Sequence, residues 1–234
     1  MGKLFLALFS VFIFGLGSLY AEVSVGEVDK LVKENNVKEV GYDYVLSKIG
    51  DGRVGHTKAI LLDARPEKRF NAGHIPGALL MLDTKVDETI GAVLKDVPKN
   101  KEIITYCQGP NCEKSVNLAI ELKKRGYTNV KVYRGGLPEW ETKAYVDIGL
   151  EAAKAMYDKN GALFIDARPF GKFKQGTIVG AINILDTDFD KLWGRLPTDT
   201  RTPVVIFCGG IECEKSHVVA QRMMMMGYSK VYTF

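Results

Sequence analysis

The sequence predicts an α/β fold made of two similar units, each a mostly parallel sheet flanked by helices. Two observations support this prediction: one stretch of sequence occurs twice, and within each copy short apolar strands alternate with helix-like segments. The 234 residues, 46% of them apolar, suffice for one or two domains of roughly 100–200 residues each. This composition excludes a disordered chain and a small disulfide-stabilised scaffold.

The internal repeat is the most informative signal. Residues 61–78 read LLDARPEKRFNAGHIPGA, and residues 164–181 read FIDARPFGKFKQGTIVGA. Further along, ITYCQGPNCEKS at 104–115 is matched by IFCGGIECEKS at 206–216. One domain of about 100 residues is therefore used twice.

The repeat also divides the chain. We place the first domain at residues 40–142 and the second at residues 145–234, with Pro138 to Tyr145 as the linker. An N-terminal extension at residues 22–39 precedes the first domain and has no visible counterpart in the second copy.

Each copy contains the same series of elements. A helix is expected after the Cys107 loop, because apolar residues recur at helical spacing from Val116 to Leu122 and Gly126 stands where a C-terminal glycine is expected. Strands that alternate with helices favour a parallel sheet covered on both faces. β-Branched and apolar segments predict the strands at 59–62, 78–82, 103–106 and 130–133 in the first copy, and at 162–165, 181–185 and 204–207 in the second.

The first 21 residues have the layout of a secretory signal peptide. Lys3 precedes an apolar run from Leu4 to Leu16, small residues follow, and Ala21 offers a cleavage point. We therefore expect an exported protein, periplasmic or secreted. Nothing after residue 21 is long and apolar enough to cross a membrane, so we expect no membrane contact after cleavage.

Charge gives no support for a nucleic-acid partner. The 32 basic and 28 acidic residues nearly balance, and they form no long run of one sign. Because nucleic-acid binding needs clustered basic residues, we expect no such partner. The net charge of +4 favours small anions only weakly.

All four cysteines lie at two equivalent places. Cys107 and Cys208 each follow a predicted buried strand and precede a helix, while Cys112 and Cys213 lie five positions later. In an open α/β sheet this edge is where ligands bind, and a helix N-terminus there favours a thiolate and attracts an anion. The pattern indicates a sulfur nucleophile that attacks an anionic substrate.

Two further pairs of residues belong to this candidate site. Lys114 and Lys215 would each add a positive charge close to the cysteines. Arg65 and Arg168, in the repeated Asp-Ala-Arg turn, either pair with the neighbouring Asp to hold the loop or meet a substrate anion, since Arg prefers oxyanions.

Other interpretations of the cysteines stay open. Cysteines five positions apart in an exported protein can form a short structural disulfide. A zinc site is disfavoured, because the cysteines belong to two separate domains and neither pair has His partners nearby. We expect neither a metal nor another cofactor. His74 becomes Thr177 in the second copy, so we interpret His74 as structural.

These motifs resemble the rhodanese family. The resemblance rests on DARPEKRFNAGHIPGA, on a strand ending in Tyr-Cys with a helix behind it, and on GYTNVKVYRGGLPEW. Two copies make the chain similar to tandem-domain sulfurtransferases, and the resemblance covers roughly residues 40–234. The second copy keeps the first pattern and loses the end of the last one.

The resemblance implies two tandem rhodanese-like domains and transfer of sulfane sulfur. A cysteine takes sulfur from a donor such as thiosulfate or polysulfide, becomes a persulfide, and passes the sulfur to a thiophilic acceptor. By this resemblance Cys107 and Cys208 are the candidate persulfide sites, and Lys114 and Lys215 lie in the cationic loop. Implied partners are small sulfur anions, protein persulfides, or a protein of a respiratory or sulfur-relay pathway.

The cysteine loops depart from the family pattern. Many rhodanese loops carry a basic residue about five positions after the cysteine, whereas here a second cysteine stands there and Lys follows two positions later. Cys112 and Cys213 are thus candidate resolving cysteines, which would attack the persulfide, release sulfide and close a disulfide. Cell-cycle phosphatases share the fold but carry Arg after five intervening residues, so a phosphatase is disfavoured.

Two alternatives to a sulfurtransferase remain from the sequence. The chain could be a non-catalytic sulfur carrier or binding module of a periplasmic sulfur pathway. It could also be a thiol–disulfide oxidoreductase that uses each Cys-x4-Cys pair. Stable sulfur loading without turnover would indicate the first, and a strongly oxidising or reducing potential would indicate the second.

Overall fold

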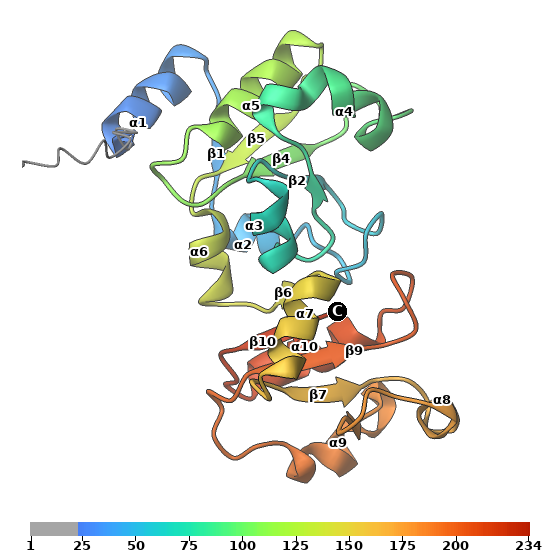
Figure 1. Ribbon diagram of the computed structural model, residues 1–234. Coiled ribbons are helices and arrows are strands. Elements are labelled where there is room, and N and C mark those ends of the chain that lie inside the picture. The colour runs from blue at the N-terminus through green and yellow to red at the C-terminus, as the bar shows by residue number, and fades with distance from the viewer. Residues whose placement is uncertain (1–22) are drawn as a thin grey trace, which may run out of the picture.

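The computed structural model describes residues 23–234 as two α/β domains, one above the other in Figure 1. The predicted signal peptide at residues 1–21 lies outside the described residues. Within the described residues no helix is long and apolar enough to cross a bilayer.

The first domain contains a sheet of five parallel strands in the order β1-β5-β4-β2-β3. Its strands are β1 (Lys38–Val40), β2 (Ile60–Asp63), β3 (Leu79–Leu80), β4 (Ile103–Tyr106) and β5 (Val130–Tyr133). Its helices are α1 (Val25–Glu34), α2 (Tyr42–Leu46), α3 (Glu67–Ala72), the short 3₁₀ turn η1 (Asp83–Lys85), α4 (Val86–Val93), α5 (Lys114–Lys124) and α6 (Gly136–Glu141).

The second domain repeats this sheet in the order β6-β10-β9-β7-β8, again with all neighbours parallel. Its strands are β6 (Val146–Asp147), β7 (Leu163–Asp166), β8 (Ile182–Asn183), β9 (Val204–Phe207) and β10 (Val231–Thr233). Its helices are α7 (Leu150–Asp158), α8 (Phe170–Gln175), η2 (Asp186–Asp188), α9 (Phe189–Leu192), η3 (Trp193–Arg195) and α10 (Lys215–Met225). The predicted fold class is confirmed.

The central strands are buried on both faces. In β4 all four residues are buried, with Ile104 and Tyr106 in one apolar cluster and Ile103 in another. Successive side chains of a strand point to opposite faces, so a strand covered on both sides is a continuous apolar run. This is why the sequence predicts β2, β4, β7 and β9 to within a residue.

Two features differ from the prediction. Strand β6 occupies in the second sheet the place that β1 has in the first, so part of the segment before residue 40 does have a counterpart. The predicted linker from Pro138 to Tyr145 begins as helix α6, since a proline is tolerated in the first turn of a helix. The Trp140 side chain is fully buried, and its Nε1 donates to the Tyr145 carbonyl at 2.9 Å.

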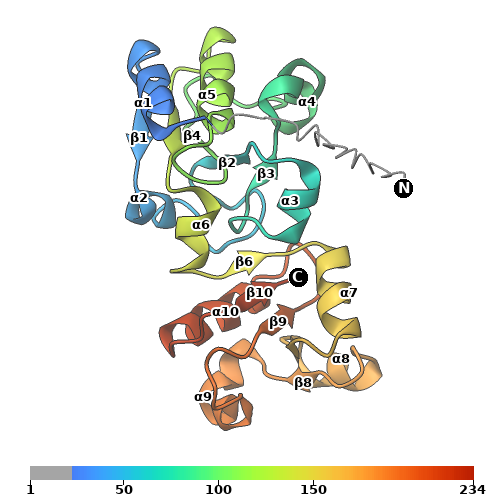
Figure 2. The ribbon, with the colours of Figure 1, turned by 60° about the vertical axis from the view of Figure 1, so that its left-hand side comes forward.

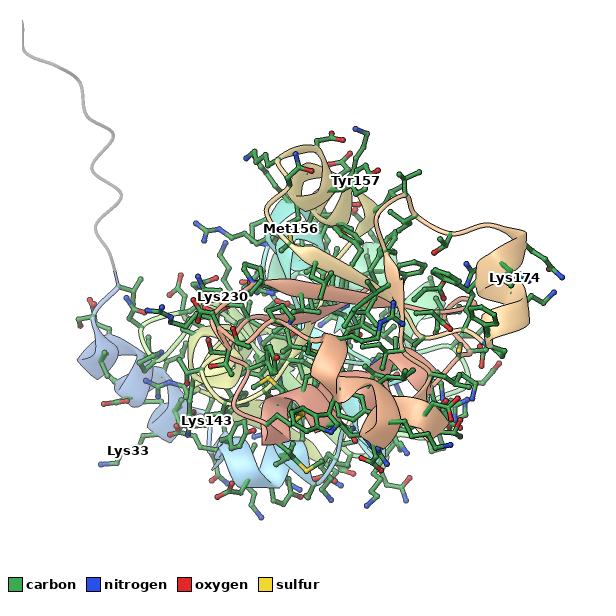
Figure 3. All side chains as sticks on the ribbon, turned by 90° about the horizontal axis from the view of Figure 1, so that it is seen from below. Lys33, Lys143, Met156, Tyr157, Lys174 and Lys230 are labelled. Atoms are coloured by element: carbon green, nitrogen blue, oxygen red, sulfur yellow. A yellow bond between two sulfur atoms is a disulfide. The ribbon has the colours of Figure 1, made fainter. Side chains whose placement is uncertain are left out.

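The two domains share an apolar core. One cluster extends from Leu61 and Trp140 of the first domain through Val146 to Phe164 and Phe207 of the second. Figure 2 shows β6 at the junction of the two domains and α7 along the side of the second domain. Figure 3, seen from below, shows Met156 and Tyr157 of α7 and Lys174 of α8 at the margin of the second domain.

Backbone hydrogen bonds reinforce this junction. The amide of His74 donates to the Asp147 carbonyl at 2.9 Å, and the amide of Asp147 donates back at 3.0 Å. The amide of Gly149 donates to the Asn71 carbonyl at 2.8 Å. The segment after α6 is thus fixed to both domains.

Candidate functional site

The two cysteine loops have the same backbone form. The amide of Cys112 donates to the Gly109 carbonyl at 3.0 Å, and that of Cys213 donates to the Gly210 carbonyl at 2.9 Å. Gly109 and Gly210 have φ angles of 126° and 131°, a region that glycine adopts readily. Each loop connects the end of a buried strand to the start of a helix, as the sequence predicts.

The first loop is closed. Cys107 and Cys112 form a disulfide, and Cys107 is only 2% exposed. Helix α6 lies against it: the amide of Leu137 donates to the Cys107 carbonyl at 3.0 Å, and a Cβ on Gly136 would stand 2.3 Å from that oxygen. Arg134 also donates to the Pro110 carbonyl at 2.6 Å, which fixes the far side of the loop.

The second loop carries two free thiols. Cys208 and Cys213 are both partly exposed. The Cys208 sulfur lies 3.1 Å from the Cys213 carbonyl oxygen and 3.3 Å from the Ser216 hydroxyl. This contrast between the loops favours Cys208, rather than Cys107, as the accessible sulfur.

The two thiols of this loop differ in acidity. Burial raises the pKa of Cys208, and its hydrogen bond to Cys213 raises it further. Burial opposes ionisation of Cys213 as well, but hydrogen bonds from Cys208 and from the backbone of Gly209 and Lys215 outweigh it and lower the Cys213 pKa. The hydrogen bonds of this loop thus favour the ionised form of Cys213 over that of Cys208.

Cys208 opens onto a pocket of about 520 Å³ between the two domains. The first domain and the junction contribute residues to the pocket wall, and the second domain contributes its cysteine loop and strand β10. The lining residues are Gly52, Arg53, Val54, His74, Asp147, Ile148, Phe207, Cys208, Gly209, Gly210, Ile211, His217, Thr233 and Phe234.

Neither of the two loop lysines lines this pocket. Lys215 forms an ion pair with Asp186 at 3.2 Å and does not line the pocket, although its charge helps to lower the Cys213 pKa. Lys114 is exposed at the start of α5 beside the closed first loop.

Arg65 and Arg168 each pair with the neighbouring Asp and hold their loops, which is the first of the two roles expected from the sequence. Arg65 forms a buried ion pair with Asp63 and donates to the Gly73 carbonyl at 2.6 Å. Arg168 repeats this with Asp166 and with the Gly176 carbonyl at 2.6 Å. Because these bonds occupy the guanidinium groups, and neither residue lines the pocket, the geometry favours a role in loop structure.

A polar cluster at the pocket was not predicted. Burial raises the pKa of Asp147 to about 7, although Thr233 and the Gly77 amide donate to its carboxylate. His217 Nδ1 lies 3.8 Å from that carboxylate and 3.2 Å from the Tyr145 hydroxyl, and burial lowers the His217 pKa to about 4. These residues are distant in sequence, so no local motif identifies the cluster.

His74 has the contacts of a structural residue and also lines the pocket. Its ring stacks on Phe70 at 3.8 Å and its Nδ1 lies 3.0 Å from the Phe70 carbonyl, as expected for a structural residue. It also lines the pocket, and burial lowers its pKa to about 4. Among the described residues, no group of three or more His, Cys, Asp or Glu is arranged to hold a metal ion.

Fold and site together define a class: a tandem α/β protein in which a cysteine at a strand-to-helix loop faces a pocket between the domains. A family model for the rhodanese-like domain matches residues 42–143 and 150–234, well over half of the chain. The chain therefore belongs to the rhodanese-like domain family.

Individual relatives cover parts of the chain. It is 32% identical over 91 residues to the uncharacterized protein YqhL of Bacillus subtilis, a match of 39% of this chain and 68% of that one. It is 29% identical over 80 residues to an HTH-type transcriptional regulator of Mycobacterium tuberculosis, of which it spans 33%, using 34% of its own length.

Solved structures to which the chain is similar include the thiosulfate sulfurtransferase of Pseudomonas aeruginosa. The two are 20% identical with a TM-score of 0.37, over 85% of this chain and 41% of that chain.

Proposed function

We propose that the protein is a sulfurtransferase that carries sulfane sulfur as a persulfide on Cys208. The observation that carries this proposal is the free Cys208 thiol on the wall of the interdomain pocket, in one loop with a second free thiol whose pKa is lowered. Membership in the rhodanese-like family supports the same reaction. Cys107 lies in a closed loop as a disulfide, so it is not the working site in this state.

The chemistry follows from the pair of thiols. The Cys213 thiolate takes the Cys208 proton, which makes Cys208 the nucleophile despite its raised pKa. With thiosulfate as donor, Cys208–S⁻ and S₂O₃²⁻ give Cys208–S–S⁻ and SO₃²⁻. An acceptor such as cyanide then takes the outer sulfur as thiocyanate and restores Cys208–S⁻.

Cys213 offers a second route for the sulfur. Its thiolate attacks the inner sulfur of a protonated Cys208 persulfide, so that a Cys208–Cys213 disulfide forms and HS⁻ leaves. The Cys107–Cys112 disulfide supports this step, because the two loops share the same backbone form. In this role Cys213 is the resolving cysteine.

We also propose that the protein works after export, in the periplasm or outside the cell. The support is the sequence of residues 1–21, with its basic start, apolar run and small residues before Ala21. Small sulfur compounds and protein persulfides of a respiratory or sulfur-relay pathway are the proposed partners.

The test is the intact mass of the protein after incubation with thiosulfate or polysulfide. Wild type and Cys107→Ser should each gain one sulfur atom, and Cys208→Ser should gain none. Cys213→Ser should gain the sulfur more slowly but keep it longer, because internal release is lost. Loading that persists in Cys208→Ser would overturn the assignment of the site. Loading without turnover to cyanide would favour a sulfur carrier instead.

A second candidate function is thiol–disulfide exchange. The observation that favours it is the disulfide in one loop and the free pair in a loop of the same form. Loss of two hydrogens per pair on oxidation, with no sulfur gain from any donor, would favour this function. A gain of one sulfur that depends on Cys208 would exclude it as the main activity.

A further inference from the structure

The connection between α2 and β2 in the first domain is longer than its counterpart in the second. It covers residues 47–59, whereas the connection between α7 and β7 covers only residues 159–162. The longer connection reaches the other domain: a Cβ on Gly52 would stand 2.6 Å from the Tyr145 hydroxyl and 2.8 Å from His217 Nδ1. The first domain thus places a loop of its own beside the Cys208 pocket, which Arg53 of this loop lines.

Arg53 ties this loop to both neighbours of Cys213. Its Nη1 donates to the Glu212 carbonyl at 3.0 Å, and its Nη2 lies 3.3 Å from the Glu214 carboxylate. Within its own domain, its Nε donates to the Asp51 carboxylate at 3.0 Å, which fixes the direction of the guanidinium. Because a guanidinium is planar and its donors are rigidly placed, it holds several acceptors in one fixed arrangement. The segment around Cys213 is therefore held by the first domain.

The first cysteine loop lacks this tie. Among the residues that the structure describes, no side-chain hydrogen bond or ion pair holds Asn111 or Glu113, the two neighbours of Cys112. Arg134 holds that loop earlier, at the Pro110 carbonyl. The first loop is the one whose sulfurs are bonded to each other, and the loop tied to the other domain is the one whose thiols are free.

We propose that Arg53 is a positioning residue that keeps Cys213 from attacking the sulfur carried by Cys208. This inference rests on the proposed persulfide chemistry, and it assigns control of the internal release of sulfide to the first domain. To close the disulfide, the Cys213 sulfur must come within about 2 Å of the Cys208 sulfur. Arg53 opposes this movement because it holds the residues on both sides of Cys213.

The position of Arg53 decides where the sulfur goes. While the tie holds, the persulfide lasts until an external acceptor takes its outer sulfur. When the tie is lost, the Cys213 thiolate attacks the inner sulfur of the protonated persulfide, the Cys208–Cys213 disulfide forms and HS⁻ leaves.

The first experiment measures the disulfide equilibrium in glutathione buffers of graded potential. Oxidised glutathione and the two thiols give the Cys208–Cys213 disulfide and two reduced glutathiones, and alkylation with peptide mass mapping distinguishes this pair from the first one. We expect Arg53→Gln to shift the equilibrium constant about tenfold toward the disulfide, which is the scale of one hydrogen bond to a charged group. The Cys107–Cys112 pair serves as an internal control and should not shift.

The second experiment measures how long the persulfide lasts. The protein is loaded with sulfur, the donor is removed, and both the intact mass and the released sulfide are followed. Arg53→Gln should release sulfide about tenfold faster than wild type, since the relative placement of two reacting groups controls an intramolecular rate. Arg53→Gln combined with Cys213→Ser should keep its sulfur as long as Cys213→Ser alone. A general loosening of the fold would not produce this dependence on Cys213.

Two further variants test the tie itself. Glu214→Gln weakens one of the two contacts from the side of the second domain, so it should change both measurements in the same direction by a smaller factor. Arg201→Gln is the matched control. Arg201 makes the same turn with the Asp two positions earlier, its Nε donating to Asp199 at 3.0 Å, and it does not line the pocket. This control should behave as wild type does.

The outcomes separate this inference from the proposed function. An unchanged disulfide equilibrium and unchanged sulfide release in both Arg53→Gln and Glu214→Gln would overturn the inference while sulfur loading stands. Equal effects of Arg53→Gln and Arg201→Gln would also overturn it. If no donor loads Cys208 in any variant, the proposed function falls, and the glutathione measurement still decides whether Arg53 holds the loop open.

Discussion

Arg65 and Arg168 make the same contacts in different surroundings. Each arginine pairs with the Asp two positions earlier and donates to a glycine carbonyl eight positions later. The Arg65 side chain is 3% exposed, whereas that of Arg168 is 26% exposed. The repeat thus provides a natural comparison of one ion pair at two depths.

This comparison predicts unequal losses of stability. Arg65→Gln leaves the buried Asp63 carboxylate without its partner and should lower the free energy of unfolding by about 3–5 kcal/mol, the usual cost of breaking a buried pair. Arg168→Gln should cost clearly less, because water reaches that guanidinium. Urea unfolding of both variants measures the difference, and equal losses would contradict the argument.

Asp147 predicts a pH dependence of stability. Its folded pKa of about 7 lies above its ordinary value, so between about pH 4 and 7 the folded protein binds a proton that the unfolded chain has released. The free energy of unfolding contributed by this residue therefore falls as the pH rises through that range. Asp147→Asn should remove this loss and gain stability relative to wild type, by up to about 4 kcal/mol above pH 7.

The pH profile of Asp147→Asn is compared with that of wild type, because His74 and His217 change the free energy of unfolding in the opposite direction as the pH rises. Their pKa values of about 4 lie below the ordinary value, so their contribution is lost as the pH falls from about 6.5 to 4. Both histidines remain in Asp147→Asn, and only the difference between the two pH profiles reports Asp147. A difference that is constant from pH 4 to 8 would show that Asp147 does not titrate there.

At the scale of elements, the sequence predicts what depends on local pattern. The strands of buried parallel sheets are continuous apolar runs, and the cysteine loops follow directly from the ends of two such strands. Strands β1 and β6 are short and lack such runs, and Pro138 made α6 look like a linker. The repeat shows where both cysteine pairs lie, but it does not show that α6 packs against the first loop and leaves the second loop without such a helix.

The pocket itself could not be predicted from local pattern. Its wall joins Arg53, Asp147, Cys208 and His217, which lie on segments far apart in the chain. Asp147, Cys208 and His217 belong to the second domain, and the packing of the first domain against it adds Arg53 to the wall. The same packing leaves Lys215 outside the pocket, although its sequence position beside Cys213 suggests a role in binding.

The equivalent glycines of the two cysteine loops provide a prediction about these elements. A Cβ on Gly109 or on Gly210 would meet no atom within 4 Å, so alanine there introduces backbone strain alone. We expect Gly109→Ala and Gly210→Ala to lower stability by a similar amount, on the order of 1 kcal/mol. Only Gly210→Ala should also slow sulfur loading, because it shifts the open loop. Slower loading in Gly109→Ala would implicate the first loop in the reaction.

At the scale of the whole molecule, the two domains are energetically connected. The apolar cluster that runs through Trp140, Val146 and Phe207 belongs to both, and the His74–Asp147 bridge joins their backbones. Separating the domains would expose this cluster to water, which disfavours any state with one domain folded alone.

This connection predicts a single unfolding transition. The chain has two tryptophans, Trp140 in the first domain and Trp193 in the second. Fluorescence of Trp193→Phe therefore reports the first domain, and that of Trp140→Phe reports the second. Wild type should unfold in one calorimetric transition, and each variant should show the same midpoint by fluorescence and calorimetry. Two separate transitions would mean that the domains fold independently.

The junction also limits how such a protein can be recombined. Residues 145–149 supply a strand to the second sheet through β6, yet they are bonded to His74 and Asn71 of the first domain. A chimera that takes one half from a relative must cross this segment, and whichever parent supplies it, one half receives a strand shaped for another neighbour. Because the same segment carries Asp147 into the pocket, exchanging halves would change the chemistry beside Cys208 as well as the fit of the domains.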